Sequence, residues 1–195
     1  MATRDVILDA AAEVIRSLGL GRATTKEIAR ASGYSEATLY KHFQGKEELF
    51  VAVLRERVPS FGPLREALAR RPGDGSVRDN LADVVRAAAM FYVDSFPMSA
   101  SIYSEPALLA AHRTGVARQG NGPQVALEVL AEYLRGEQRV GRVLADADAA
   151  AVAAMVLGAA LNYGFLTSFA GRSAEAAEVE RLAAAVADTA VRAIR

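Results

Sequence analysis

Near the start of the chain, apolar side chains return every three or four positions, which is the spacing of an amphipathic helix. The repeat predicts a helix over residues 3–18, with Thr3 as its N-cap and Gly19 as the residue that ends it. The apolar residues that recur at this spacing are Ile7, Ala10, Ala11, Val14 and Leu18.

Two short helices are predicted next, over residues 25–31 and from residue 35 or 36 to 43, with Ser-Gly-Tyr between them. Each has a Ser or Thr in position to cap its first turn. A longer helix is expected to begin near Lys46 and to run toward Pro59.

The remainder of the chain also has helical spacing, interrupted by the loop-forming residues 71–76. Ala dominates the apolar residues and β-branched runs are few, so the fold class is predicted to be all-α. We expect Ser173 to cap the last helix. We also expect a functional boundary near residue 50. The expected helices are 63–70, 77–95, 105–115, 123–135, 147–169 and 174–193.

Residues 149–171 carry no charge over a length that could cross a membrane. Much of the segment is Ala, and it also contains Asn162, Thr167, Ser168 and three glycines, so its transfer free energy into lipid is modest. We therefore expect a buried helix of a protein that does not enter the membrane.

The composition narrows the chemistry. There is no Cys and there are two His, which excludes disulfides, thiolate metal sites and a Cys nucleophile. Asp5 and Asp9 interrupt the apolar residues of the N-terminus, unlike a secretory signal, so a cytoplasmic location is expected. Neither a metal nor a cofactor is expected.

The formal net charge is zero, so any affinity for nucleic acid must come from a local patch. Residues 22–46 provide one, with a local excess of basic over acidic side chains. The basic residues are Arg22, Lys26, Arg30, Lys41 and Lys46, against Glu27 and Glu36.

The same segment has the spacing of a helix-turn-helix that begins at Thr25. Ala29 is small where the second helix must cross closely, and Gly33 allows a left-handed turn. The space between the two helices is predicted to be filled by Ile28, Tyr34 and Leu39.

With Leu39 facing the core, a rotation of about 100° per residue turns Ala37 and Lys41 outward, toward base edges in a major groove. Thr38 and Tyr40 lie on the flanks, facing the phosphates. Lys46 begins the next helix, whose N-terminus favours an anion.

Residues 24–50, TTKEIARASGYSEATLYKHFQGKEELF, resemble the DNA-binding signature of TetR-family repressors, most specifically in Tyr-x-His-Phe followed three residues later by Lys. The resemblance implies a three-helix, helix-turn-helix DNA-binding domain over residues 1–50. It also implies a ligand-binding and dimerisation helical bundle over residues 51–195. It further implies phosphate contacts from Thr25, Tyr40, His42 and Lys46, and base or groove contacts from Lys26, Glu36, Ala37, Thr38 and Lys41.

Three roles stay open. Glu36 either accepts from cytosine or caps its helix, and His42 is either a phosphate ligand or a packed histidine. Tyr34 stands where family members usually have a smaller aliphatic residue, so its ring either covers the turn or leans toward the DNA backbone.

The part of the chain beyond residue 50 has no sharp motif. Most of its aromatic and Met side chains are expected to be core, and a subset to line an apolar effector cavity. The candidates are Tyr92, Phe96, Tyr103, Tyr133, Met155 and Asn162. The last two helices, with a stripe of Leu182, Val186 and Thr189 or Ala190, form a four-helix bundle with a second subunit in the family.

The sequence thus predicts a homodimeric repressor that binds a palindromic double-stranded DNA operator and is released by an unknown small-molecule effector. An enzyme is the first alternative, but there is no glycine-rich phosphate loop or Ser-His-Asp arrangement, and His112 has no evident partner. A sequence-indifferent DNA-binding protein is the second, and zero net charge disfavours it.

Overall fold

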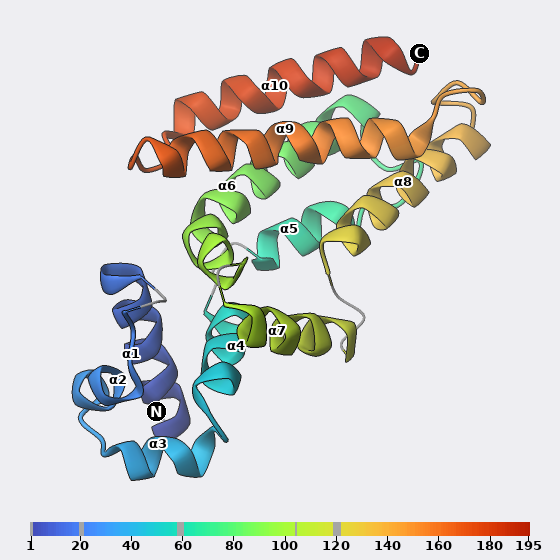
Figure 1. The fold of residues 1–195 in the computed structure, drawn as a ribbon. Helices are drawn as coiled ribbons and strands as arrows, with labels where there is room; N and C mark the ends of the chain where they lie inside the picture. Colours follow the sequence, from blue (N-terminus) through green and yellow to red (C-terminus); the bar gives the residue numbers. More distant parts are fainter. Residues whose placement is uncertain (1, 20–21, 58–60, 104, 119–121) are drawn as a thin grey trace. The chain divides into compact units, whose positions relative to one another are not determined.

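The computed structural model describes residues 2–19, 22–57, 61–103, 105–118 and 122–195, and these residues contain helices and no strand (Figure 1). The predicted all-α fold class is confirmed. Two compact units share the chain: Met1–Pro59 with Ser95–Asn121, and Ser60–Asp94 with Gly122–Arg195. The functional boundary near residue 50 stays a prediction.

The first unit is built on four N-terminal helices. They are α1 (Thr3–Leu18), α2 (Thr25–Ser32), α3 (Glu36–His42) and α4 (Lys46–Glu56). Helix α1 packs against α2, α3 and α4, and α7 (Pro106–Arg118) packs against α4. Leu8, Ile28 and Leu39 are fully buried between these helices, because each stands on the apolar face of its own helix.

The second unit contains α5 (Phe61–Leu68), most of α6 (Val77–Tyr103), α8 (Pro123–Arg139), α9 (Ala149–Phe169) and α10 (Ala176–Ala193). Its core is rich in Ala, Val and Leu from α6, α8, α9 and α10, and Figure 1 shows α10 running alongside α9. Gly164 allows close packing, since a Cβ there would lie 2.6 Å from Tyr92 Cβ. Salt bridges from Arg78 to Asp188 (2.8 Å) and from Arg86 to Glu180 join α6 to α10.

Several predicted helix ends were wrong. Thr3 is the first helical residue and Ala2 is the N-cap, so Thr3 does not cap α1. The last helix begins at Ala176 after Glu175, without a side-chain cap from Ser173. Helix α6 extends past residue 95 through Pro97, because buried Met98 and Ile102 continue its packed face. The expected approach of α4 to Pro59 lies outside the described residues.

The expectation that α9 is buried was also wrong. By length and composition α9 could cross a membrane, and 33% of its most apolar window is buried. The inward face consists of small or branched residues such as Ala153, Val156 and Ala160. The outward face carries exposed residues three or four positions apart: Ala151, Met155, Gly158, Leu161, Asn162, Phe165, Leu166 and Phe169.

Candidate nucleic-acid interface

The two helices of the helix-turn-helix begin and end as local rules require. Thr24 caps α2 in a capping box, accepting from the Glu27 backbone N–H while the Glu27 carboxylate accepts from the Thr24 N–H. Gly33 ends α2 in the left-handed conformation at φ 74°, which L side chains rarely adopt. Ser35 then caps α3 by accepting from the Thr38 N–H at 3.2 Å. Both predicted Ser or Thr caps are therefore confirmed.

Helix α3 turns the predicted side chains outward. Leu39 and Phe43 are buried, whereas Ala37 and Lys41 are exposed on the opposite side. Tyr40 is 50% exposed, so it is not part of the core. This short helix thus offers a small apolar residue and a cation side by side, which suits close approach to base edges.

A chain of hydrogen bonds links the starts of α2 and α3. Thr25 Oγ1 donates to Glu36 Oε2 at 2.9 Å, and the Tyr40 hydroxyl donates to Thr25 Oγ1 at a longer 3.4 Å. Glu36 and Tyr40 are one turn apart on α3, so both reach Thr25 from the same side of the helix. Of the two roles left open for Glu36, the cap belongs to Ser35.

The start of α4 contributes a further cation. Lys46 is the first residue of α4, and its ammonium lies 5.1 Å from the centroid of the Phe50 ring. Gln44 N–H donates to Glu48 Oε2, which fixes the approach of the chain to this helix. Lys46 is half-buried, so the Phe50 ring orients its charge without enclosing it.

The remaining predicted DNA-contact residues are accessible. Lys26 and His42 are exposed, and Thr38 is half-buried with its hydroxyl 3.0 Å from that of Ser35. The exposure of His42 removes the alternative of a packed histidine. Tyr34 is 38% exposed beside the turn.

Sequence reasoning missed the ion pairs that attach α1 to α4. Arg4 donates to both carboxylate oxygens of Glu56, at 2.7 and 2.8 Å, while Arg57 pairs with Asp5 and Asp9. The hydrogen bonds with Glu56 raise the pKa of Arg4, whose guanidinium also lies over the Phe43 ring. The spacing of Asp5 and Asp9 on one helix face was the available signal.

Comparison with known proteins agrees with this geometry. The family model for bacterial regulatory proteins of the tetR family matches residues 7–53. An uncharacterized HTH-type transcriptional regulator of Mycobacterium bovis is 34% identical over 152 residues, which are 77% of this chain and 74% of that protein. The chain belongs to the TetR family. It is a transcriptional regulator with an N-terminal DNA-binding helix-turn-helix.

Solved structures show that the TetR-like fold extends over the whole chain. The transcriptional regulator FadR of Bacillus subtilis, in complex with stearoyl-CoA, has a TM-score of 0.71 at 18% identity, covering 98% of this chain and 99% of that one. SmeT, the repressor of the Stenotrophomonas maltophilia multidrug efflux pump SmeDEF, was solved with triclosan. That complex has a TM-score of 0.69 at 20% identity, covering 100% and 92% of the two chains.

The predicted effector residues of this TetR-like chain are divided between the two units. Phe96 and Tyr103 belong to the first unit, and Tyr103 is 72% exposed. In the second unit, Tyr133 is buried and its hydroxyl accepts from Asn80 Nδ2 at 2.9 Å, and burial raises its pKa to about 12. Tyr92 is half-buried, and Met155 and Asn162 are exposed on α9. The effector site of this TetR-family member stays a prediction.

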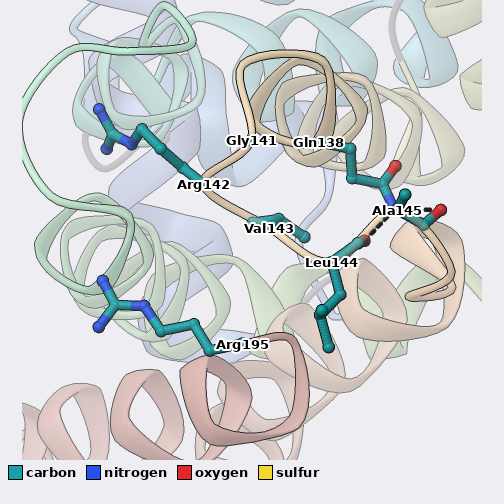
Figure 2. A pocket seen from close by; sticks show the side chains of 7 residues that line it. All are labelled: Gln138, Gly141, Arg142, Val143, Leu144, Ala145 and Arg195. Carbon is teal, nitrogen blue, oxygen red and sulfur yellow. Dashed lines mark hydrogen bonds between the residues drawn. The ribbon is translucent and has the colours of Figure 1, made fainter.

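A surface depression of about 600 Å³ lies between the end of α8, the α8–α9 loop and the C-terminal residue (Figure 2). Arg142 on its rim donates to the carbonyls of Gly73 and Gly75 and pairs with the buried Glu137 at 3.1 Å. Its guanidinium therefore binds the α5–α6 loop. The lining contains none of the predicted effector residues: it consists of Gln138, Gly141, Arg142, Val143, Leu144, Ala145 and Arg195.

Proposed function

We propose that this TetR-family regulator is a dimeric, cytoplasmic repressor that binds an inverted-repeat operator and leaves it when a small molecule binds. The observation that carries the proposal is the outward face of α3, where exposed Ala37 and Lys41 lie between flanking groups that can hold phosphates. Family membership and the SmeT likeness support repression. We infer that it is not an enzyme, because its relatives are transcriptional regulators.

Base edges and phosphates are assigned to different side chains. Lys41 and Ala37 face the major groove, with Lys26, Glu36 and Thr38 beside them at its edge. Phosphates are held by Thr25, Tyr40, His42 and Lys46. Lys46 has the additional advantage of a helix N-terminus, where backbone N–H groups and the helix dipole favour an anion.

The dimer is proposed to form through α9 and α10. The outward face of α9 carries no charge from Met155 to Phe169 and is apolar apart from Asn162. Leu182 and Val186 on α10 are only half-buried within the chain. An exposed, mostly apolar face without charge is typical of a protein interface. A second copy related by a two-fold axis would cover it and would place two α3 helices about 34–36 Å apart, in successive major grooves.

The response to a ligand is proposed to pass through α7 to the DNA-contact residues. Within the first unit α7 packs on α4, and a small hollow of about 50 Å³ is lined by Lys46, Glu47 and Phe50 from α4. Glu105, Ala107 and Leu108 line its other side. A shift of α7 would therefore act directly beside Lys46. The ligands of FadR and SmeT support a small-molecule effector for this chain, whose identity the proposal leaves open.

The test is selection of duplexes from a random DNA pool by the full-length protein, followed by footprinting. We expect an inverted repeat whose half-sites are one helical turn apart, protected on both halves. Enrichment of no sequence, or protection of a single unrepeated half-site, would overturn the proposed function.

A further inference from the structure

An acidic side chain lies among the groups proposed to hold phosphates. Glu36 is half-buried at the start of α3, and its carboxylate accepts from Thr25, which in turn accepts from Tyr40. Among the described residues, no ion pair with Lys or Arg compensates the charge of Glu36. An anion in this place is unexpected for a surface that must approach the DNA backbone.

Counting protons shows what the chain of hydrogen bonds prevents. A hydroxyl has one proton to donate: that of Thr25 goes to Glu36, and that of Tyr40 goes to Thr25. Phosphate oxygens only accept. The Thr25 hydroxyl therefore cannot donate to a phosphate while Glu36 holds it, whereas the exposed Tyr40 hydroxyl has only to leave its long bond to Thr25.

Release of Thr25 has a consequence for Glu36. Once the Thr25 hydroxyl turns to a phosphate, the carboxylate loses its donor beside the anionic backbone. It needs another donor, and exposed Ala37, the next residue on α3, leaves room for it to turn toward a base edge. The donors in the major groove are the exocyclic amino groups of cytosine and adenine.

We propose that Glu36 determines specificity by withholding the Thr25 hydroxyl from phosphate until its carboxylate accepts from a base amino group. Base recognition and backbone contact are then coupled: on a wrong sequence Glu36 stays on Thr25, and the phosphate contact of Thr25 is lost. The proposal rests on the proposed function and adds a regulation of the same surface.

The experiment compares the duplex enriched by the wild-type protein with a shuffled duplex of equal composition. Glu36→Ala is expected to bind the shuffled duplex about five-fold more tightly, and its ratio of affinities for the two duplexes is expected to fall about ten-fold. Repeated selection with Glu36→Ala is expected to lose one cytosine or adenine preference in each half-site. Glu13→Gln on α1 is the matched control for net charge, because its exposed side chain pairs only locally with Arg16.

A double-mutant cycle with Thr25→Val separates withholding from simple positioning. On the shuffled duplex, Thr25→Val is expected to change the affinity of the wild-type protein by less than about two-fold. In the Glu36→Ala background it should weaken binding about three- to five-fold, since the hydroxyl is then free to hold a phosphate. A merely structural Glu36 would leave the effect of Thr25→Val the same in both backgrounds.

The proposal would be overturned if Glu36→Ala lost affinity equally for both duplexes, or if Glu13→Gln reproduced the effect of Glu36→Ala. If circular dichroism shows that Glu36→Ala is unfolded, Glu36→Gln replaces it, because a neutral amide oxygen accepts from Thr25 more weakly than a carboxylate does. Glu36→Gln is then expected to gain affinity for the shuffled duplex. Failure to enrich an inverted repeat would count against the proposed function alone, since the cycle can be read on any duplex that lacks such a repeat.

Discussion

Helices α3 and α9 each expose a face that is proposed to bind a partner, but the two faces have opposite chemistry. Helix α3 is short and turns Lys41, Tyr40 and Ala37 outward. Helix α9 is three times as long, at 21 residues against 7, and turns out Met155 and Phe165 without a single charge. The first face suits a polyanion, and the second suits an apolar protein surface.

The difference shows how far local sequence rules extend. The outward face of α3 can be derived from a cap, a turn glycine and a rotation of 100° per residue. The faces of α9 cannot, because both are apolar and the pattern has no polar side to mark the surface. The following tests ask whether each face has the partner that its chemistry implies.

The largest effect is expected from a charge on the α9 face. Phe165→Glu would place an unpaired carboxylate in the proposed dimer interface and weaken the dimer by about 3 kcal/mol, roughly a hundred-fold in dissociation constant. Sedimentation equilibrium measures this directly. Val129→Glu, at a partly exposed apolar position on α8, is the control and should leave the dimer intact. A dimer that tolerates Phe165→Glu would remove α9 from the interface.

The inward face of α9 is tested by its packing. Gly164→Ala would bring a Cβ within 2.9 Å of the Tyr92 backbone carbon, so we expect it to lower the free energy of unfolding by about 2 kcal/mol. Urea denaturation gives the value. Gly158→Ala, on the outward face of the same helix, meets no atom within 4 Å inside the chain. If Gly158→Ala lowered the free energy of unfolding as much as Gly164→Ala, the outward face would be packed as closely as the inward one.

On α3 and the start of α4, two lysines should behave differently. Lys46→Ala is expected to weaken binding to all duplexes about equally and to lower the salt slope by about one. Lys41→Ala is expected to cost about 1–3 kcal/mol of discrimination at one position of each half-site. Fluorescence anisotropy over a range of salt concentrations separates the two effects. Identical behaviour of the two variants would contradict the division into base and phosphate contacts.

The smallest effect concerns His112 on α7. Burial lowers the pKa of His112, and its Nδ1 has no hydrogen-bond partner among the described residues. The unfolded chain therefore takes up the proton first, and stability present above pH 6.5 is lost as the pH falls through the lower folded value. We expect the free energy of unfolding to fall by less than about 1 kcal/mol between pH 7 and pH 5. His112→Gln should flatten this part of the stability profile.

Much of the DNA-contact surface follows from the sequence because its rules are local. The caps at Thr24 and Ser35 and the left-handed Gly33 lie within a few residues of the turns that they define. Other features depend on distant partners. The hydrogen bond between Thr25 and Glu36 joins two helices, and Arg4 pairs with Glu56, which lies 52 positions away in the sequence. No periodicity in the sequence contains these pairs.

The sequence by itself determined the all-α class, the helix-turn-helix and the outward residues of α3, because caps, turn conformations and helical rotation are properties of short segments. Tertiary structure alone decided which side of α9 is buried and where the candidate effector residues lie. It also decided which donor satisfies Glu36. These outcomes depend on what other helices cover, and burial is a property of the packed chain that a uniformly apolar segment does not encode.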